Sequence, residues 1–301
     1  MLLVTGATGF LGTNVLRAAV EQGRDIVAAV RTGQPSVPTA GLVHADLTDK
    51  AVVREMIAAI RPEWILNCAA LANLDPCEND PDKARRLNAT APANLAAACS
   101  EFGARLLQVS TDSVFDGNRG MYCEDDIPSP VNVYASSKLE GERAVREALP
   151  RALVVRTNFI GTPAKNGGGL AAWIADSVEQ GMPIKGFDDV IFSPLLATTL
   201  AERLFEMMDA NLQGLFHLGA RDSMSKYEFA LSIARELGHV GETIERASLR
   251  DMPATLRRPL NTSLVSLKAE KALGGSLPTV YEAVQGFVAQ RRESTHSPVV
   301  V

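Results

Sequence analysis

A glycine-rich turn at the start of the chain constrains the fold more than any other feature. The segment TGATGFLG places Gly6, Gly9 and Gly12 between a short apolar run and an amphipathic stretch. In this spacing Gly6 permits a tight turn, Gly9 lets the backbone approach a pyrophosphate, and Gly12 lets helix and strand pack closely. The following helix offers free N–H groups and its positive dipole end to an anion. The turn therefore predicts a dinucleotide site; the alternative is a glycine turn without a ligand.

The first half of the chain alternates short apolar runs with amphipathic stretches. Runs such as LLVT, DIVAAV and RLLQVS have the length and composition of buried strands, and the stretches between them repeat with a period near 3.6. Right-handed connections between such units build an α/β fold, a Rossmann-type doubly wound parallel sheet with ligands at the carboxyl ends of its strands. We expect strands at 2–5, 25–30, 41–46, 64–69, 105–110 and 152–157, and helices at 11–22, 50–60, 82–102 and 135–149.

After residue 157 the alternation becomes irregular. We interpret 1–157 as a dinucleotide-binding domain to which segments near 190–220 return, and 158–290 as a smaller, interleaved substrate-binding α/β lobe. The glycine-rich stretch 163–169 is typical of a loop, and 291–301 lacks periodicity and is expected to be a flexible tail. After residue 169 we expect helices at 170–180, 195–209 and 225–237 and a strand at 183–187, and we expect the strand GLFHLG (214–219) to return to the large sheet.

Composition and charge exclude several classes of protein. A net charge of -5 gives no basic footprint for nucleic acid or an anionic membrane. No apolar run reaches the roughly 18 residues of a membrane span, and Met1 leads directly into a strand, which leaves no room for a signal peptide. Cys68, Cys77, Cys99 and Cys123 form no CxxC pair, and the histidines form no metal-ligand cluster. We therefore expect a cytoplasmic protein with reduced thiols and no metal site, as a monomer or homodimer.

The residue after the second expected strand bears on the choice of dinucleotide. An NAD site carries an acidic residue at the end of that strand, roughly 20 residues beyond the glycines, to bind the ribose 2′-hydroxyl. This chain has Arg31 there, directly after DIVAAV. A guanidinium can pair with the 2′-phosphate of NADP, so the sequence favours NADP(H), with NAD(H) as the alternative if Arg31 is merely a solvated charge. Asp46, after the third strand, is a candidate contact for the adenine amino group.

A tyrosine and a lysine four residues apart form the candidate chemical centre. VYASSKLEGE puts Tyr134 and Lys138 on one helix face, and STDS sets Thr111 at the carboxyl end of the fifth strand. Hydride transfer to a ketone needs a proton donor at the oxygen that gains charge. A nearby ammonium lowers a tyrosine pKa from its ordinary value of about 10, so we expect Lys138 to make Tyr134 a better general acid. Lys138 would also reach the nicotinamide ribose, and the Thr111 hydroxyl would bond the reacting oxygen.

With these motifs the chain resembles the extended short-chain dehydrogenase/reductase superfamily, and within it the dTDP-4-dehydrorhamnose reductases. The resemblance covers roughly residues 1–290, and the pair STDSVFDG and VYASSKLEGE is its most specific part. It rests on TGATGFLG, NCAALANLDPCENDP (67–81), LNATAPANLA (87–96), VSTDSVFDG (109–117), NVYASSKLEGE (132–142), VVRTNFIG (154–161), GLFHLG (214–219) and RPLNTSL (258–264).

The resemblance implies NAD(P)H-dependent reduction of a 4-keto group on a nucleotide-activated deoxysugar, as in dTDP-rhamnose biosynthesis. It implies that Thr111, Tyr134 and Lys138 are catalytic, and that Asn158 and Phe159 face the substrate together with Thr111. The smaller lobe would hold the nucleotide. Beyond the residues already named for the cofactor, the resemblance adds Phe10, Leu11, Leu47, Ala69, Ala70, Leu71 and Asn88.

The sequence departs from the usual pattern of these reductases at two positions of the expected site. They usually carry glutamine where this chain has Phe10 and tryptophan where it has Phe159. Their usual GxPT-like segment corresponds here only to FSPLLATT (192–199). These departures leave the sugar and the nucleotide open rather than the reaction type.

Two rival functions remain open from the sequence. The first is another nucleotide-sugar or small-carbonyl enzyme, such as an epimerase; a 4,6-dehydratase usually carries Glu where this chain has Ser113, which argues against that chemistry. The second is a non-catalytic regulatory subunit, because similar proteins bind methionine adenosyltransferase as its beta subunit. Such a subunit has no need of Tyr134 and Lys138, so their presence favours an enzyme.

Four further residues have two interpretations each. Trp173 stands beside a glycine-rich stretch and either lines the substrate cleft or packs in the lobe. Arg257 and Arg258 either meet a substrate diphosphate or lie on the surface. His217 alternates within GLFHLG, which favours a hydrogen-bonded sheet residue over a catalytic base.

Overall fold

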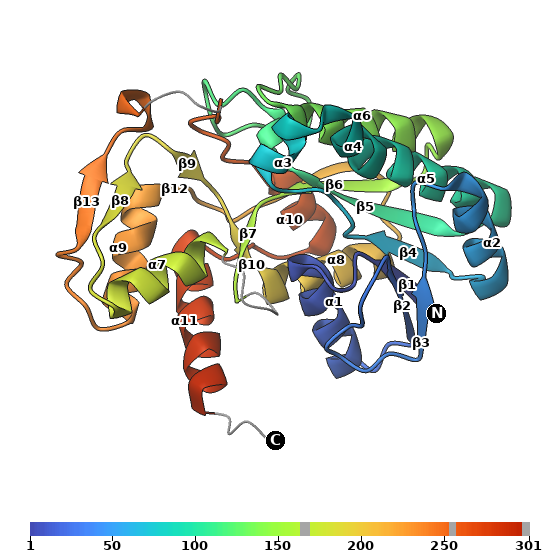
Figure 1. The fold of residues 1–301 in the computed structure, drawn as a ribbon, viewed down its shortest axis with the longest axis horizontal. Helices are drawn as coiled ribbons and strands as arrows, with labels where there is room; N and C mark the ends of the chain where they lie inside the picture. The colour runs from blue at the N-terminus through green and yellow to red at the C-terminus, as the bar shows by residue number, and fades with distance from the viewer. Residues whose placement is uncertain (163–168, 253–256, 297–301) are drawn as a thin grey trace.

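The fold is built on one parallel sheet of seven strands. This computed structural model describes residues 1–162, 169–252 and 257–296. The strand order is β11-β6-β5-β4-β1-β2-β3, so the chain winds outward from β1 in both directions (Figure 1). The prediction of a doubly wound parallel sheet is confirmed, including the return of GLFHLG as β11 beside β6. The strands are β1 Leu2–Thr5, β2 Ile26–Val30, β3 Gly41–His44, β4 Trp64–Asn67, β5 Arg105–Thr111, β6 Leu153–Thr157 and β11 Gly214–Leu218.

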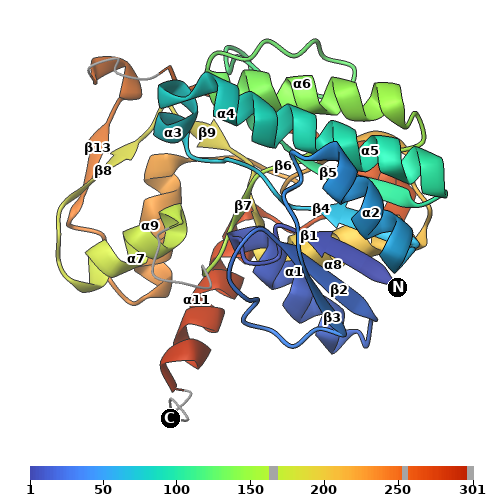
Figure 2. The same ribbon diagram turned by 45° about the vertical axis from the view of Figure 1, so that its right-hand side comes forward.

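Helices cover both faces of this sheet, because its strands are apolar on both sides. In β1, Leu2 and Val4 belong to one core cluster and Leu3 to the other. Figures 1 and 2 show α2, α5 and α6 on one face and α1 and α8 on the other. These helices are α1 Phe10–Glu21, α2 Lys50–Ile60, α5 Ala91–Phe102, α6 Val133–Ala148 and α8 Ala197–Asp209; α10 Leu267–Leu273 packs beside β11.

The stretch expected as one helix over 82–102 is interrupted. It forms α4 (Pro81–Arg85), a π-helical turn η1 (Arg86–Thr90) and then α5, with the N–H of Ala91 bonded to the carbonyl of Arg86. Pro92 explains the change, because it has no N–H to give to the Asn88 carbonyl in a regular helix. α6 crosses at the freed carbonyl: a Cβ on Gly141 would lie 2.1 Å from it. Wide turns of this kind are frequent at functional sites.

The second half forms a lobe beside the carboxyl end of the sheet. Three two-stranded pairs tie it together: β7 with β10, β8 with β13, and β9 with β12. The expected helix at 170–180 and strand at 183–187 are present, whereas the strand pairs around them were not predicted. The elements are β7 Phe159–Ile160, α7 Leu170–Glu179, β8 Ile184–Phe187, β9 Ile191–Phe192, β10 Leu195–Leu196, β12 Met224–Ser225, α9 Lys226–Glu236, β13 Ile244–Ala247 and α11 Val280–His296.

Short helical turns and one correction complete the description. The turns are α3 (Leu74–Asn79), η2 (Asp112–Val114) and η3 (Leu249–Asp251). The expectation of a tail from Arg291 is wrong for 291–296, because α11 continues to His296; 297–301 and most of the expected loop 163–169 lie outside the described residues. The four cysteines are free thiols. Among the described helices, none is long and apolar enough to cross a membrane.

Candidate active site

The three candidate catalytic residues come together where β5 ends against the first turns of α6. The Asn132 side chain caps α6 by accepting from the Ala135 N–H at 2.9 Å, which fixes the start of the helix. Tyr134 and Lys138 then lie one turn apart on α6, and Thr111 is the last residue of β5. A hydrogen-bonding interaction between Thr111 and Tyr134 influences the tyrosine pKa, so the two hydroxyls are neighbours.

Lys138 is buried and bonded to the sheet. Its Nζ donates to the carbonyl oxygen of Val109 at 2.8 Å, and its side chain is 5% exposed. Burial lowers the Lys138 pKa to about 8, and the nearby Glu142 carboxylate and Cys68 thiol oppose that fall. The amine is therefore held in a fixed place at the β5 end, with its proton less tightly bound than on an exposed lysine.

The expectation that Lys138 lowers the pKa of Tyr134 is wrong. Burial raises the Tyr134 pKa to about 12; the Thr111 hydroxyl lowers it, and the Asp112 and Cys77 side chains raise it further. Desolvation dominates because a phenolate loses its hydration in the half-buried recess, while the Lys138 ammonium is directed at Val109. The phenol is protonated at neutral pH, as an ordinary tyrosine also is, and the raised pKa means that it holds its proton more tightly.

Asp112 is a site residue that sequence analysis did not single out. It is 1% exposed and accepts from Asn158 Nδ2 at 2.8 Å and from Thr262 Oγ1 at 2.6 Å. The Thr111 hydroxyl donates to its other oxygen at 3.1 Å. Asp112 thus joins the candidate catalytic threonine to the candidate substrate residue Asn158. Its position inside STDS, between two hydroxyl residues at a strand end, was the available signal.

Asn88 connects the cofactor side of the site to α6. Its side chain accepts from the Leu71 N–H at 2.8 Å and donates to the Leu71 carbonyl at 3.0 Å. It also donates to Ser137 Oγ at 3.0 Å, and that hydroxyl donates to the Tyr134 carbonyl at 2.8 Å. Asn88 lies in the π-helical turn and is buried, so its hydrogen bonds join the Leu71 segment to α6.

A cavity of about 330 Å³ opens at the carboxyl ends of β1, β2 and β4. Most of the expected cofactor residues line it, whereas Phe10, Leu11, Gly12 and Asn88 do not, and neither do Tyr134 and Lys138. Thr8, Thr32, Cys68, Lys83 and Leu87 also line it and were not predicted. The expected residues that line the cavity are Gly6, Gly9, Arg31, Asp46, Leu47, Ala69, Ala70 and Leu71.

The glycine turn fits a bound pyrophosphate. Gly6 has φ +66°, and a Cβ there would lie 2.6 Å from the Ala69 nitrogen; a Cβ on Gly12 would lie 2.1 Å from the Gly6 oxygen. Gly9 caps α1 without any side-chain hydrogen bond, and the first turn of α1 carries no acidic residue. The N–H groups at this helix end are thus free of a competing carboxylate, as an anion requires, and the capping Gly9 lines the cavity.

Arg31 and Asp46 both line this cavity, beyond the ends of β2 and β3. Both are exposed, and the Arg31 charge contributes to lowering the pKa of Asp46, whose largest causes are its hydrogen bonds with Thr48. Asp46 Oδ1 accepts from the Thr48 N–H at 2.9 Å and from its hydroxyl at 2.7 Å. The carboxylate is therefore held in place, and the Arg31 charge acts on it without a direct ion pair among the described contacts.

A second cavity, of about 490 Å³, lies in the lobe between α7, β8 and the start of α9. Trp173 lines it and is 47% exposed, which supports the cleft interpretation over packing. Arg258 lines it too, whereas Arg257 lines a different cavity beside α3 and α6. The two arginines are therefore neighbours in sequence but line different cavities.

Lys226, the first residue of α9, was missed as a site residue. Lys226 lines the second cavity, and its Nζ lies 3.1 Å from the centroid of the buried Phe192 ring. Burial lowers its pKa to about 7; Asp112 raises it and Arg258 lowers it. The Asp112 carboxylate and the Lys226 amine therefore interact electrostatically. Because Lys226 lines the lobe cavity and Asp112 follows Thr111, that cavity lies close to the Thr111 end of β5. The sequence predicts only an amphipathic helix here, and a lysine in its first turn does not stand out as a candidate site residue.

A family model described as the RmlD substrate binding domain matches residues 1–293 of the chain. The chain belongs to the RmlD family. This places it among the extended short-chain dehydrogenase/reductases, NAD(P)-dependent oxidoreductases with a Rossmann-like fold. The resemblance stated from the sequence is confirmed.

The RmlD relationship extends along nearly the whole chain in several comparisons. The probable low-salt glycan biosynthesis reductase Agl14 of Haloferax volcanii is 34% identical over 290 residues, with 95% of this chain and 96% of that protein covered. The dTDP-4-dehydrorhamnose reductase of Mycobacterium tuberculosis is 33% identical, with 92% and 88% covered. A dTDP-4-dehydrorhamnose reductase structure from Bacillus anthracis, in complex with NADP, superposes with a TM-score of 0.85 at 27% identity, with 96% and 98% covered.

One similar protein is named as a subunit of another enzyme, which bears on the alternative that this chain is a regulatory subunit. The beta subunit of methionine adenosyltransferase 2 from Bos taurus is 34% identical over 252 residues, with 77% of this chain and 71% of that protein covered. Membership of the RmlD family therefore identifies the fold and the cofactor class, and the substrate has to be argued from this chain's own site.

Phe10 and Phe159, the two residues that depart from the usual pattern of the RmlD reductases, contact each other. The rings of Phe10 and Phe159 contact edge to face, with centroids 5.4 Å apart. Gly161 and Gly169 make room for Phe10, since a Cβ on either would lie 3.1–3.3 Å from its ring. Phe10 thus packs between the glycine turn and the lobe, and Leu11 is buried in the core, which explains why neither lines the cofactor cavity.

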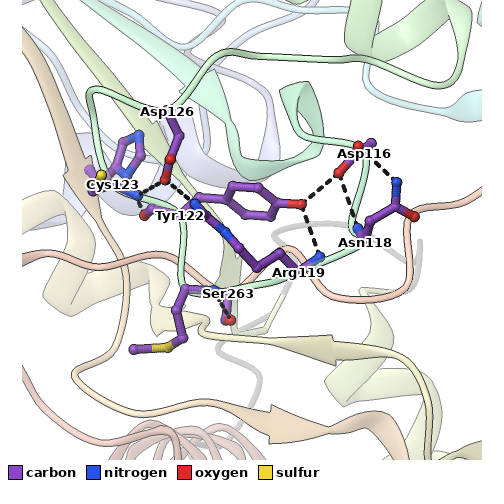
Figure 3. Close-up of polar contacts among 9 residues, drawn as sticks. Asp116, Asn118, Arg119, Tyr122, Cys123, Asp126 and Ser263 are labelled. Carbon is purple, nitrogen blue, oxygen red and sulfur yellow. Dashed lines mark hydrogen bonds and ion pairs between the residues drawn. The ribbon is translucent and has the colours of Figure 1, made fainter.

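The RmlD motifs VSTDSVFDG and RPLNTSL pack against each other. Gly117 has φ +77°, and a Cβ there would lie 2.5 Å from the Leu260 nitrogen. Figure 3 shows the loop that follows: the Tyr122 hydroxyl donates to Asp116 at 2.6 Å, and Asp126 pairs with Arg119. The imidazole Nδ1 of His217 lies 3.0 Å from the Tyr122 carbonyl, and burial lowers its pKa to about 4, as for a structural sheet residue.

Proposed function

We propose that this protein catalyses NADP(H)-dependent reduction of the 4-keto group of a nucleotide-activated deoxysugar. The observation that carries the proposal is the Tyr134 phenol beside the Thr111 hydroxyl at the end of β5, with the buried Lys138 amine one turn further along α6. A phenol that can give a proton and a neighbouring second hydroxyl are what a ketone oxygen requires as it gains charge.

Each residue of the trio has a separate task in this proposal. Tyr134 Oη gives its proton to the sugar oxygen. The Thr111 hydroxyl, whose single proton points to Asp112 in this structure, would rotate to donate to the same sugar oxygen. Lys138 binds the nicotinamide ribose through Nζ and stabilises the phenolate that Tyr134 leaves behind. Bound NADPH supplies the hydride. Asp112 orients Thr111 and Asn158, so the substrate hydroxyls meet fixed partners.

The charge of the lobe cavity supports a nucleotide-linked substrate over a small carbonyl. Lys226 and Arg258 both line it, together with the exposed ring of Trp173. Arg258 is a cation, and a bound diphosphate would favour the charged form of Lys226, whose pKa is about 7 without a ligand. An indole face suits a base or a sugar ring. The cofactor side supports NADP(H), because Arg31 stands at the rim of the adenosine end and no acidic residue follows β2 directly.

The regulatory-subunit alternative is disfavoured by the assembled trio. A purely binding role needs the glycine turn but gives no reason for a buried amine bonded at the β5 end beside a protonated phenol. We therefore propose an enzyme, while the identity of the sugar and the nucleotide is a matter for experiment.

The test is NADPH consumption with a panel of dTDP-, UDP- and GDP-linked 4-keto sugars and a free keto sugar. We expect turnover with a nucleotide-linked sugar, and loss of about 10²–10⁴-fold of kcat in Tyr134→Phe, with NADPH binding kept within a few-fold. Tyr281→Phe, on the exposed surface of α11, is the matched control and should keep full activity. Near-normal turnover by Tyr134→Phe would disprove the proton-donor role, and turnover of the free sugar alone would disprove the substrate class.

A further inference from the structure

Lys138 and Glu142 do not pair, although their spacing favours it. They lie one turn apart on α6, an arrangement in which lysine and glutamate ordinarily bond across the helix surface. Both side chains are buried, at 5% and 3% exposure. Within the described residues, however, the hydrogen bond of Lys138 Nζ goes to the Val109 carbonyl. Other residues must therefore bind the Glu142 carboxylate and keep it from pairing with Lys138 Nζ, the amine of the proposed mechanism.

Arg156 and Ser110 occupy the Glu142 carboxylate. Arg156 Nε lies 3.0 and 3.2 Å from its two oxygens, and Nη2 donates to Oε2 at 2.7 Å. The Ser110 hydroxyl donates to Oε1 at 2.5 Å. Both oxygens are thus engaged by the sheet, and the carboxylate has little capacity left for a third strong donor.

The holding residues come from adjacent strands beneath α6. Ser110 on β5 pairs in register with Arg156 on β6, and Arg156 pairs with His217 on β11, so the three side chains form a row across the sheet. His217 is uncharged at neutral pH because burial lowers its pKa, so it does not compete for Glu142. Arg156 is 2% exposed, and its Nη1 has no hydrogen-bond partner in the described part of the chain. The ion pair is thus built into the core.

Losing the arginine would change the partner of Glu142. A buried carboxylate without a partner is costly, and it recruits the nearest cation or becomes protonated. Lys138, four residues earlier on the same helix, is that cation. Its ammonium would then turn from the Val109 carbonyl toward Glu142 and away from the cofactor cleft.

We propose that Arg156 and Ser110 are positioning residues that hold the Glu142 carboxylate and so leave Lys138 free for the cofactor ribose and Tyr134. The inference rests on the role proposed above for Lys138. Among the described residues, the groups whose charge acts on Lys138 are Glu142 on its own helix and Cys68 beyond β4, and Tyr134 lies one turn earlier on α6. Arg156 and Ser110 are distinct from the proposed catalytic residues Thr111, Tyr134 and Lys138, since Arg156 acts only through Glu142.

The test measures Lys138 ionisation directly, without substrate. Lysine side chains labelled with ¹³C are titrated by NMR in the wild type and in Arg156→Met, and Lys138→Gln assigns the signal. We expect Arg156→Met to raise the Lys138 pKa by about one unit, as a freed carboxylate does, and to weaken NADPH about tenfold. Ser110→Ala removes one bond to Glu142 and should shift both quantities in the same direction by less.

Two further variants separate positioning from folding. Arg156→Met/Glu142→Gln has neither charge, so it should fold and bind NADPH within about threefold of the wild type, with a Lys138 pKa below the wild-type value. Arg54→Met removes an ion pair of the same geometry with Glu101 on the surface and should change neither quantity. An unshifted Lys138 pKa in Arg156→Met and Ser110→Ala, or a double variant that folds but still binds NADPH about tenfold more weakly, would overturn the proposal whatever the enzyme reduces.

Discussion

Replacing Arg31 tests the cofactor argument most sharply, because one cofactor carries the matching charge and the other does not. Arg31 is exposed at the rim of the cofactor cavity, so its interaction with a 2′-phosphate runs through water. Two unit charges 4 Å apart in water gain about 1 kcal/mol, and a phosphate monoester carries about −1.5 to −2 at pH 7. Arg31→Ala should therefore cost NADPH about 1.5–2 kcal/mol, or about 10- to 30-fold in Kd.

NADH binding should change by less than about twofold in the same variant, because its 2′-hydroxyl carries no charge. The neighbouring Asp46 carboxylate, unopposed once Arg31 is gone, would add repulsion against NADPH only. The difference should shrink in 1 M salt, where the screening length falls to about 3 Å.

The assay is the quenching or enhancement of reduced-nicotinamide fluorescence on titration with each cofactor. Arg24→Ala is the matched control: Arg24 lies at the opposite end of β2, pairs with Asp209, and should affect neither cofactor. Equal losses for NADPH and NADH, or no loss for either, would refute the assignment of Arg31 to the 2′-phosphate.

Two lysines give the remaining predictions. Lys226→Met should raise KM for the nucleotide sugar about tenfold or more and leave kcat within about threefold, because a charged contact to the diphosphate is lost. Steady-state kinetics measure both constants. A fall in kcat with an unchanged KM would contradict the prediction. Lys138 is the second case: its pKa is about 8 in the folded chain and 10.5 unfolded, so the folded state releases its proton first and the unfolded state binds more protons between these values. The free energy of unfolding should thus rise with pH through this window, by up to roughly 3 kcal/mol more in the wild type than in Lys138→Met. Denaturant unfolding of the cofactor-free protein at several pH values measures it, and parallel curves would disprove the shift.

Local rules explain what the sequence by itself determined about this protein. The glycine spacing at residues 6–12 dictates a strand-to-helix turn, and the four-residue spacing of Tyr134 and Lys138 puts them on one face of α6. Alternating apolar runs were enough to predict the parallel sheet and the return of β11. Each of these depends on residues within one or two turns of each other, or on a periodicity that any such element must have.

Only the tertiary structure decided the chemistry of these residues. Burial raises the Tyr134 pKa where the sequence suggested a fall, because solvent access depends on the packing of the whole recess. Asp112 meets Thr262, 150 residues away, and Lys226 reaches the same site from the lobe. Arg257 and Arg258 are neighbours in sequence yet line different cavities. Pair spacing along a chain says nothing about such contacts, since they form only when distant strands and helices pack and exclude water.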